Sequence, residues 1–410
     1  MSSFNQAAQL ASAVGSVMTF QIAPHIIRGT FGPIYTLPIE LLAYVFVLAL
    51  NGTRMRQTVV VTLRSVCKSW YSITEGSPIF WRSVHIRIDP NIRTNREESL
   101  KARLLRHSNV PIEVEIYVGG ASAHGEMCKC KFERGWCDVL RQYRRSLLQF
   151  LRILVGKNGI HMSRWTSFKL DQYTEWDFPN ALVHNQTDFA KVLNYPTPLL
   201  ERLEVWGVFS KNPMFPITPR LHTIWFQKTS CIFRGFSNVR RLRIEKIEDN
   251  NIPWELFQDV EELTIQIPDE EFGAAPQSIV FNRLRRLALL GSAPYELLEA
   301  IKEIPLDFLV VRVWDAMYLE RVIERLPLRD TTEIIIGGYS RLIKFRARPY
   351  AATSAEEASN LVAFVEKARG LPNVKILGQD LVEQLNGYGI NTQGIPCYAR
   401  NEADDPLNGW

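Results

Sequence analysis

The chain has 410 residues, of which 46% are hydrophobic, 11% aromatic and 22% charged. This composition is typical of a folded protein and excludes a wholly disordered chain. The net charge of +5 is too small to indicate nucleic-acid binding by itself. Six cysteines are too few for a disulfide-built scaffold and favour a reduced compartment, either the cytoplasm or the nucleus.

The N-terminal region, residues 1–33, lacks the basic start and continuous apolar centre of a secretory signal. We expect it to be a weakly ordered arm. The longest apolar run in the chain, Leu41 to Leu50, has ten residues. This is about half of the ~20 that a membrane-spanning helix needs, so we expect no membrane segment.

Residues 34–82 predict a small all-helical unit. Leu37-Pro38 opens the first helix. A proline is tolerated there, because the backbone N–H that it lacks would have no partner within the helix. Asn51-Gly52 ends it. Its apolar residues recur at helical spacing: Leu41, Leu42, Val45, Phe46 and Ala49. A second helix is predicted from the same spacing in Leu63, Val66, Cys67, Trp70 and Ile73, and Gly76-Ser77-Pro78 ends it.

This unit resembles an F-box, because its motif residues occur in the order of that family. They are Leu37-Pro38, Glu40, Leu41-Leu42, Val66-Cys67-Lys68, Trp70, Pro78 and Trp81. The resemblance implies docking on the small Skp adaptor of a cullin-based ubiquitin ligase. The contact residues that it implies are Leu37, Pro38, Glu40, Leu41, Leu42, Val45, Val66 and Cys67.

The same apolar residues would also serve as the core of a helical subdomain. Within the motif we expect Phe46, Trp70 and Trp81 to be core residues. We expect the Leu37-Pro38 turn and Leu41 to be exposed for docking.

Residues 83–164 are predicted to be a connector that leads into the repeats. Val114, Ile116 and Val118 alternate with polar or aromatic neighbours and predict a strand. Residues 136–154 predict an amphipathic helix. Its basic residues, Arg141, Arg144, Arg145 and Arg152, lie largely off the apolar face and favour a solvated surface over a nucleic-acid site.

The same region contains four potential metal ligands. His124, Cys128, Cys130 and Cys137 are residue types that zinc binds, but their spacing fits no common zinc finger. We therefore expect free cysteines near a loop, with no metal and no cofactor.

From residue 165 to 390 an apolar pattern repeats, with apolar residues at positions one, four and six. The copies are Leu200-Leu203-Val205, Leu221-Ile224-Phe226, Val239-Leu242-Ile244, Val260-Leu263-Ile265, Leu284-Leu287-Leu289, Leu306-Leu309-Val311 and a weaker Thr331-Ile334-Ile336. First positions step by 21, 18, 21, 24, 22 and 25 residues, and a partial copy is expected at Val374-Leu377. This period indicates leucine-rich repeats, in which one strand per repeat stacks on the next.

The asparagine that follows the strand in strict leucine-rich repeats is missing, so we expect an irregular α/β solenoid with variable loops. Return helices are predicted around Leu298, Ile301 and Ile304, around Val322, Ile323 and Leu326, after a capping box at Ser354 and Glu357, and from Asp380 to Gln384. Residues 391–410 form a C-terminal tail. The whole layout, with Arg164-Trp165, Phe168 and Leu170 between F-box and repeats, resembles F-box-like families expanded in fungi.

This resemblance implies a non-catalytic substrate receptor of an SCF-type (Skp-cullin-F-box) ubiquitin ligase, with a protein target on the solenoid. The alternative is a leucine-rich-repeat scaffold that acts outside a cullin ligase. Outward strand positions are expected at Glu204, Trp225, Arg243, Thr264 and Val310. Tryptophans are frequent interface anchors, so Trp206, Trp225 and Trp314 are candidates for target contacts, although packing would explain them equally well.

No catalytic motif was found. The chain contains no phosphate-binding loop, no nucleophile elbow and no His-Glu-x-x-His helix. We therefore expect no enzyme activity and no nucleic-acid partner.

Overall fold

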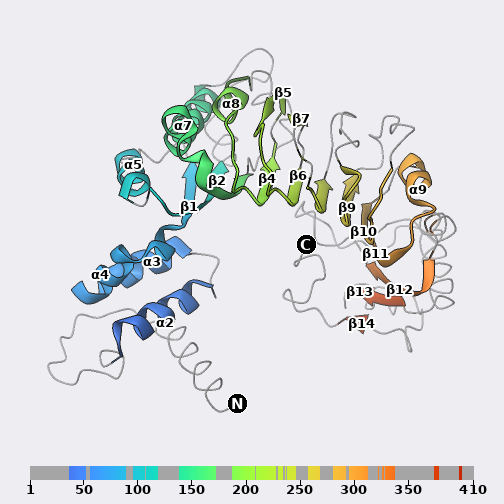
Figure 1. Ribbon diagram of the computed structural model, residues 1–410, viewed down its shortest axis with the longest axis horizontal. Coiled ribbons are helices and arrows are strands. Elements are labelled where there is room, and N and C mark those ends of the chain that lie inside the picture. Colours follow the sequence, from blue (N-terminus) through green and yellow to red (C-terminus); the bar gives the residue numbers. More distant parts are fainter. Residues whose placement is uncertain are drawn as a thin grey trace. The chain divides into compact units, whose positions relative to one another are not determined.

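A computed structural model of the chain describes its folded elements (Figure 1). The described residues are 37–51, 56–88, 96–106, 108–118, 138–171, 187–207, 209–227, 230–233, 236, 238–245, 257–267, 280–291, 295–312, 322, 326, 328–337, 374–377 and 397–398. They belong to two compact units, which we describe separately. The first contains residues 1–86 and 94–115, and the second contains 87–93 and 116–410. The protein is of mixed α/β class. The predicted arm, residues 1–33, lies outside the described part.

The described part of the first unit begins with three helices and a short 3-10 helix. They are α2 (Ile39–Asn51), α3 (Arg56–Val66), α4 (Lys68–Gly76) and η2 (Pro78–Trp81). The first helix ends at Asn51 as predicted. The single second helix was a wrong prediction, because Cys67 has an extended backbone (φ −161°, ψ 169°) that divides it into α3 and α4.

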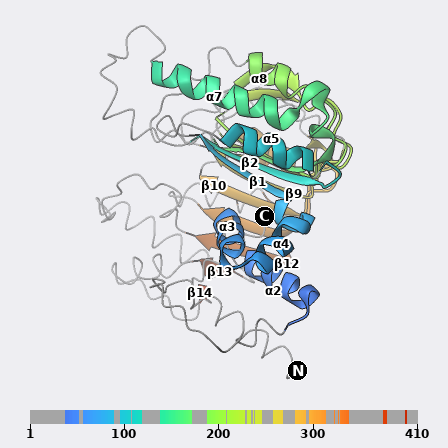
Figure 2. The same cartoon turned by 90° about the vertical axis from the view of Figure 1, so that its left-hand side faces the viewer.

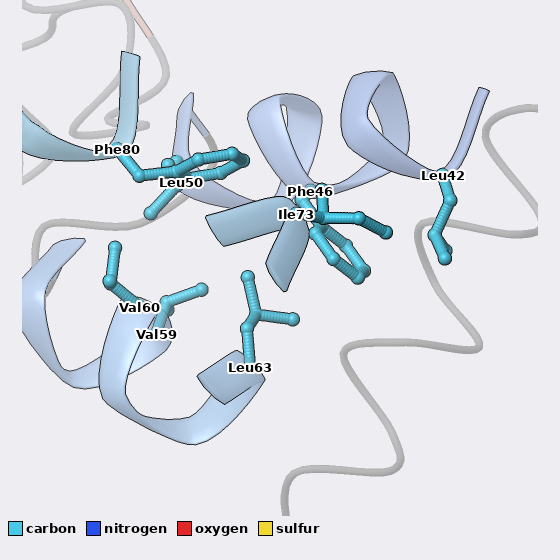
Figure 3. Packing of buried hydrophobic residues seen from close by; sticks show 8 residues of the cluster. All are labelled: Leu42, Phe46, Leu50, Val59, Val60, Leu63, Ile73 and Phe80. Atoms are coloured by element: carbon cyan, nitrogen blue, oxygen red, sulfur yellow. The ribbon is translucent and has the colours of Figure 1, made fainter. Parts of the chain in front are cut away.

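Apolar side chains from all four elements form one core (Figure 3). Its buried members are Leu42, Phe46, Leu50, Val59, Val60, Leu63, Ile73 and Phe80. The Phe46 ring lies in the middle, 4.6 Å from the Trp70 ring and 6.3 Å from the Phe80 ring between centroids. Trp70 and Trp81 pack against this core, so the prediction that Phe46, Trp70 and Trp81 are core residues is confirmed.

A strand and a helix that the sequence reading missed follow this core. Strand β1 (Ser83–Ile88) precedes helix α5 (Arg96–Arg106), and the predicted strand around Val114 is confirmed as β2 (Ile112–Val118). The guanidinium of Arg103 in α5 donates to the Ser83 carbonyl at 2.6 Å and lies 4.9 Å from the Trp81 ring centroid. This buried arginine ties α5 to the end of the helical core.

The first helix described in the second unit is the long α7 (Asp138–Val155), as the amphipathic pattern predicted. Leu147, Leu151 and Leu154 are buried, whereas Arg145 and Arg152 are exposed. The side chain of Arg141 lies outside the described part. Helix α8 (Thr187–Val192) packs beside α7 (Figures 1 and 2).

A parallel sheet whose strands follow one another in chain order makes up most of this unit. Its strands are β3 (Trp165–Asp171), β4 (Arg202–Trp206), β6 (Thr223–Gln227), β8 (Arg241–Glu245), β9 (Glu262–Ile267), β10 (Arg286–Gly291), β11 (Leu306–Arg312), β12 (Leu328–Gly337), β13 (Val374–Leu377) and β14 (Cys397–Tyr398). A separate pair, β5 (Phe209–Met214) and β7 (Ser230–Phe233), lies between them in sequence. Helices α7, α8 and α9 (Tyr295–Ile301) lie on the same side of the row of strands (Figure 1).

The register of this sheet places equivalent repeat positions opposite one another. Leu203 is paired with Ile224, and the fourth positions continue through Leu242, Leu263, Leu287, Leu309 and Ile334. These residues up to Leu309 are buried, so each repeat contributes its strand to one continuous core. The strand predictions for these copies are confirmed. Phe168 pairs with Leu203, so the pattern already begins on β3 with Trp165, Phe168 and Leu170.

The last predicted copy was placed three residues too late. Val374 pairs with Ile334, and Ile376 pairs with Ile336. Val374 therefore occupies the fourth position of its copy, not the first. In the sequence, Val374 and Ile376 are spaced like the fourth and sixth positions of the other copies, and Leu371 stands at the matching first position.

The return segments are described only in part. Leu298 and Ile301 are buried in α9, and Ile304 follows in the turn after this helix. Val322 and Leu326 are buried as well. Two predicted helices, after Ser354 and from Asp380, lie outside the described residues. So does the C-terminal tail, apart from residues 397–398. Within the described part, no helix is long and apolar enough to span a membrane.

Candidate functional site

Helix α2 has apolar side chains on two sides, and the described residues cover only one of them. Leu42, Phe46 and Leu50 point into the core. On the other side Leu41, Tyr44 and Leu48 are 52%, 61% and 40% exposed. We call these three residues the α2 surface. A helix that is apolar all round is normally buried on all sides, so this surface is suited to a partner.

The predicted adaptor contacts divide into three groups. Pro38, Glu40, Leu41 and Val66 are exposed, and Leu37, Val45 and Cys67 are half-buried. Leu42 is only 5% exposed and belongs to the core. It packs in this core, and its adaptor contact stays a prediction. Of the residues expected to be exposed, Pro38 and Leu41 are exposed and Leu37 is half-buried.

The second candidate site is the face of the sheet that carries polar side chains, which we call the open face. Side chains there alternate along each strand with the buried core residues. The register places Glu204, Trp225, Arg243 and Thr264 side by side, and Val310 continues the same column. Of these expected outward positions, Glu204, Trp225 and Arg243 are half-buried, whereas Thr264 and Val310 are buried. The accessible part of the open face therefore lies on β3, β4, β6 and β8.

Two tryptophans meet on this part of the open face. The rings of Trp206 and Trp225 lie 5.1 Å apart between centroids, at an interplanar angle of 58°. The Lys169 ammonium lies 5.3 Å from the Trp206 centroid and 5.6 Å from that of Trp225. It also pairs with the Glu204 carboxylate at 2.7 Å. Candidates Trp206 and Trp225 are thus brought together, whereas Trp314 lies outside the described residues.

Arg243 approaches the same cluster from β8. Its guanidinium lies 4.0 Å from the Trp225 centroid, and its Nε donates to Glu245 at 2.6 Å. We call Lys169, Glu204, Trp206, Trp225, Arg243 and Glu245 the tryptophan cluster. Its two indoles, on β4 and β6, lie between the cations of β3 and β8, which is a favourable arrangement because an indole face attracts a cation.

Asp171 ends β3 beside this cluster, in register with Trp206. Its side chain is buried, and burial raises the pKa of its carboxyl to about 6. The Lys169 ammonium opposes this rise and the Glu204 carboxylate adds to it. The sequence reading missed Asp171, because only the register shows that it neighbours Trp206.

A hydroxyl–imidazole–carboxylate relay in the first unit was also missed. Ser83 Oγ lies 2.7 Å from His85 Nε2, and His85 Nδ1 lies 2.5 Å from a Glu115 carboxylate oxygen. Alternation puts Ser83 and His85 on one side of β1, and Glu115 lies on β2. Such a relay can draw a proton from a serine. Here it also joins the two strands, as the ion pair of Arg82 and Glu113 does at 3.3 Å.

Among the described residues no group of histidine, cysteine, aspartate or glutamate side chains is placed to hold a metal ion. His124, Cys128, Cys130 and Cys137 lie outside them. No family model matches the chain, and comparison with curated proteins and with solved structures finds no match.

Proposed function

We propose that this protein is a non-catalytic substrate-recognition subunit of an SCF-type ubiquitin ligase. In this proposal residues 34–82 are an F-box that docks on the Skp adaptor, and through it on a cullin. Residues 165–390 are an irregular leucine-rich-repeat-like solenoid that holds a protein target. Such a role needs no cofactor and fits a cytoplasmic or nuclear protein.

The observation that carries the proposal is the α2 surface within a motif that resembles an F-box. Leu41, Tyr44 and Leu48 lie about half in solvent. Full burial of such side chains is worth ~1.5–3 kcal/mol each, so covering the exposed half yields roughly 1 kcal/mol per residue. Association itself costs about 4–15 kcal/mol, so these three contacts and the flanking Pro38 and Val66 supply only part of the binding energy, and the rest of the motif must contribute further contacts.

The second support is the sheet. Its strands follow chain order in parallel, and equivalent positions of successive repeats are in register from β4 to β12. A leucine-rich-repeat-like solenoid is built in this way, because each repeat contacts only its neighbours. The open face then supplies an extended surface for a target.

The test is co-purification of the tagged full chain with the Skp adaptor and cullin. Leu41→Asp places a charge on the α2 surface without disturbing the core, and we expect it to abolish capture of both partners. Leu105→Asp is the matched control, because Leu105 is 69% exposed on α5 and lies outside the motif. A wild-type chain that captures no adaptor would overturn the proposal.

The alternative, a repeat scaffold acting outside a cullin ligase, makes a different prediction in the same experiment. The adaptor would then co-purify with the wild-type chain without any cullin. We favour the ligase because the motif residues that it requires are present in one continuous stretch, from Leu37 to Trp81.

A further inference from the structure

The chemistry of the target follows from the open face, if the sheet is the target-binding part as proposed above. On β3, β4, β6 and β8 this face presents indoles and cations that the protein already holds in place. Lys169 and Arg243 both lie near the Trp225 ring. Because ion pairs with Glu204 and Glu245 also restrain them, a ligand that binds here pays little for ordering these long side chains.

The carboxylates of this face lie deeper than the guanidiniums. Glu245 is 4% exposed and its partner Arg243 is 15% exposed. Glu262 is 13% exposed, whereas Arg241, which it contacts at 3.1 Å, is 49% exposed. Asp171 is buried too. Lys169 and Glu204 are the exception, with similar exposure. A molecule that approaches this face therefore meets guanidiniums and indoles before it meets most of the carboxylates.

The exposed cations lie in one column. Arg202 on β4 and Arg241 on β8 flank Thr223 on β6 in the sheet register. They are two strand spacings apart, roughly 10 Å. Carboxylates on alternate residues of an extended peptide lie about 7 Å apart, so flexible arginine side chains can reach two of them at once. Guanidiniums pair with carboxylates in a planar, two-pronged manner.

We propose that this face binds an extended acidic segment of a protein target. Acidic side chains of the segment contact Arg202, Arg241 and Arg243, and an apolar side chain of the segment rests on Trp206 and Trp225. Single-stranded nucleic acid is the competing occupant, and the experiment below distinguishes it from the acidic segment.

The experiment uses the full chain and a short fluorescein-labelled peptide of repeating Glu-Leu-Glu-Ser, followed by fluorescence anisotropy. Matched peptides carry lysine or glutamine in place of glutamate. We expect only the acidic peptide to bind, and binding to weaken as salt is added. Trp225→Ala and Arg241→Glu should each weaken binding about tenfold or more, as substitutions of interface anchors do.

Arg152→Glu is the matched control, because it makes the same charge change on exposed α7 and should leave binding unchanged. Equal binding of the lysine or glutamine peptide, or wild-type affinity in Trp225→Ala, would overturn the inference. So would a single-stranded DNA that binds as tightly as the peptide and is insensitive to Trp225→Ala. Adaptor capture by the same preparations reports the F-box separately, so that failure of either proposal is recognised by itself.

Discussion

Truncating the two adjacent leucines of α2 should destabilise the helical core by very different amounts. Leu42→Ala removes a side chain from the core, where such truncations cost 2–5 kcal/mol. We expect about 2–3 kcal/mol, because Leu42 lies near the first turn of α2, where the site can partly collapse. Leu41 is about half covered, so Leu41→Ala loses roughly 0.5–1 kcal/mol of burial and leaves no cavity.

Hydrogen–deuterium exchange of the full chain measures this difference locally. Peptides from residues 39–81 should exchange about 30-fold faster or more in Leu42→Ala, since 1.4 kcal/mol corresponds to a factor of ten. In Leu41→Ala the acceleration should be about fivefold or less. Peptides from α7 serve as the internal reference and should be unchanged in both variants. Equal acceleration by the two substitutions would refute the assignment of Leu42 to the core and of Leu41 to the surface.

Three further outcomes test other parts of the structure. Glu262 pairs with both Arg241 and Arg286, at 3.1 and 3.5 Å. Glu262→Lys should therefore lower the Tm by several degrees, and Glu262→Gln should lower it less. Thermal unfolding followed by circular dichroism measures both. The pKa of Asp171 rises from 3.8 to about 6 on folding, so between these pH values the folded chain holds a proton that the unfolded chain has lost. The free energy of unfolding should therefore fall by up to about 3 kcal/mol as the pH rises from about 4 to 6. Above pH 6 it should stay at the lower value. Asp171→Asn should remove this fall in urea titrations across that window, and a persisting fall would assign it to another group. If the relay only joins strands, a fluorophosphonate probe should not label Ser83, and labelling that is lost in Ser83→Ala would contradict the non-catalytic part of the proposal.

The strands could be predicted because their signal lies within each repeat. Leu203 and Val205, or Leu263 and Ile265, stand at fixed positions after a leading apolar residue, and this spacing alone locates β4 and β9. The late placement of the last copy shows the limit of this reading. Leu377 matches the apolar pattern as well as Val374 does, and only pairing with Ile334 decides which residue holds the fourth position.

The helical unit shows why periodicity does not locate every boundary. Leu63, Val66, Trp70 and Ile73 continue one helical spacing, so the sequence carries no sign of the extended residue Cys67 between α3 and α4. Strand β1 was missed for a different reason. Val84, Ile86 and Ile88 do alternate with polar residues, but the strand directly follows the motif and was read as part of a connector.

The candidate sites were predictable only as residue types. Trp206 and Trp225 were predicted as candidate anchors, with packing as the equal alternative, but their contact with each other and with Lys169 depends on the register of β3, β4 and β6. Asp171 had no feature that distinguished it from other acidic residues. Side chains that are far apart in sequence become one site only through strand pairing, which a single sequence does not contain.

The central claim is that the α2 surface docks on the Skp adaptor. Biolayer interferometry with the purified adaptor and the full chain measures this directly. We expect tight binding by the wild type and by Leu105→Asp, and at least a tenfold loss of affinity in Leu41→Asp. Equal affinity of Leu41→Asp and Leu105→Asp would contradict it, and so would a wild-type chain that does not bind the adaptor.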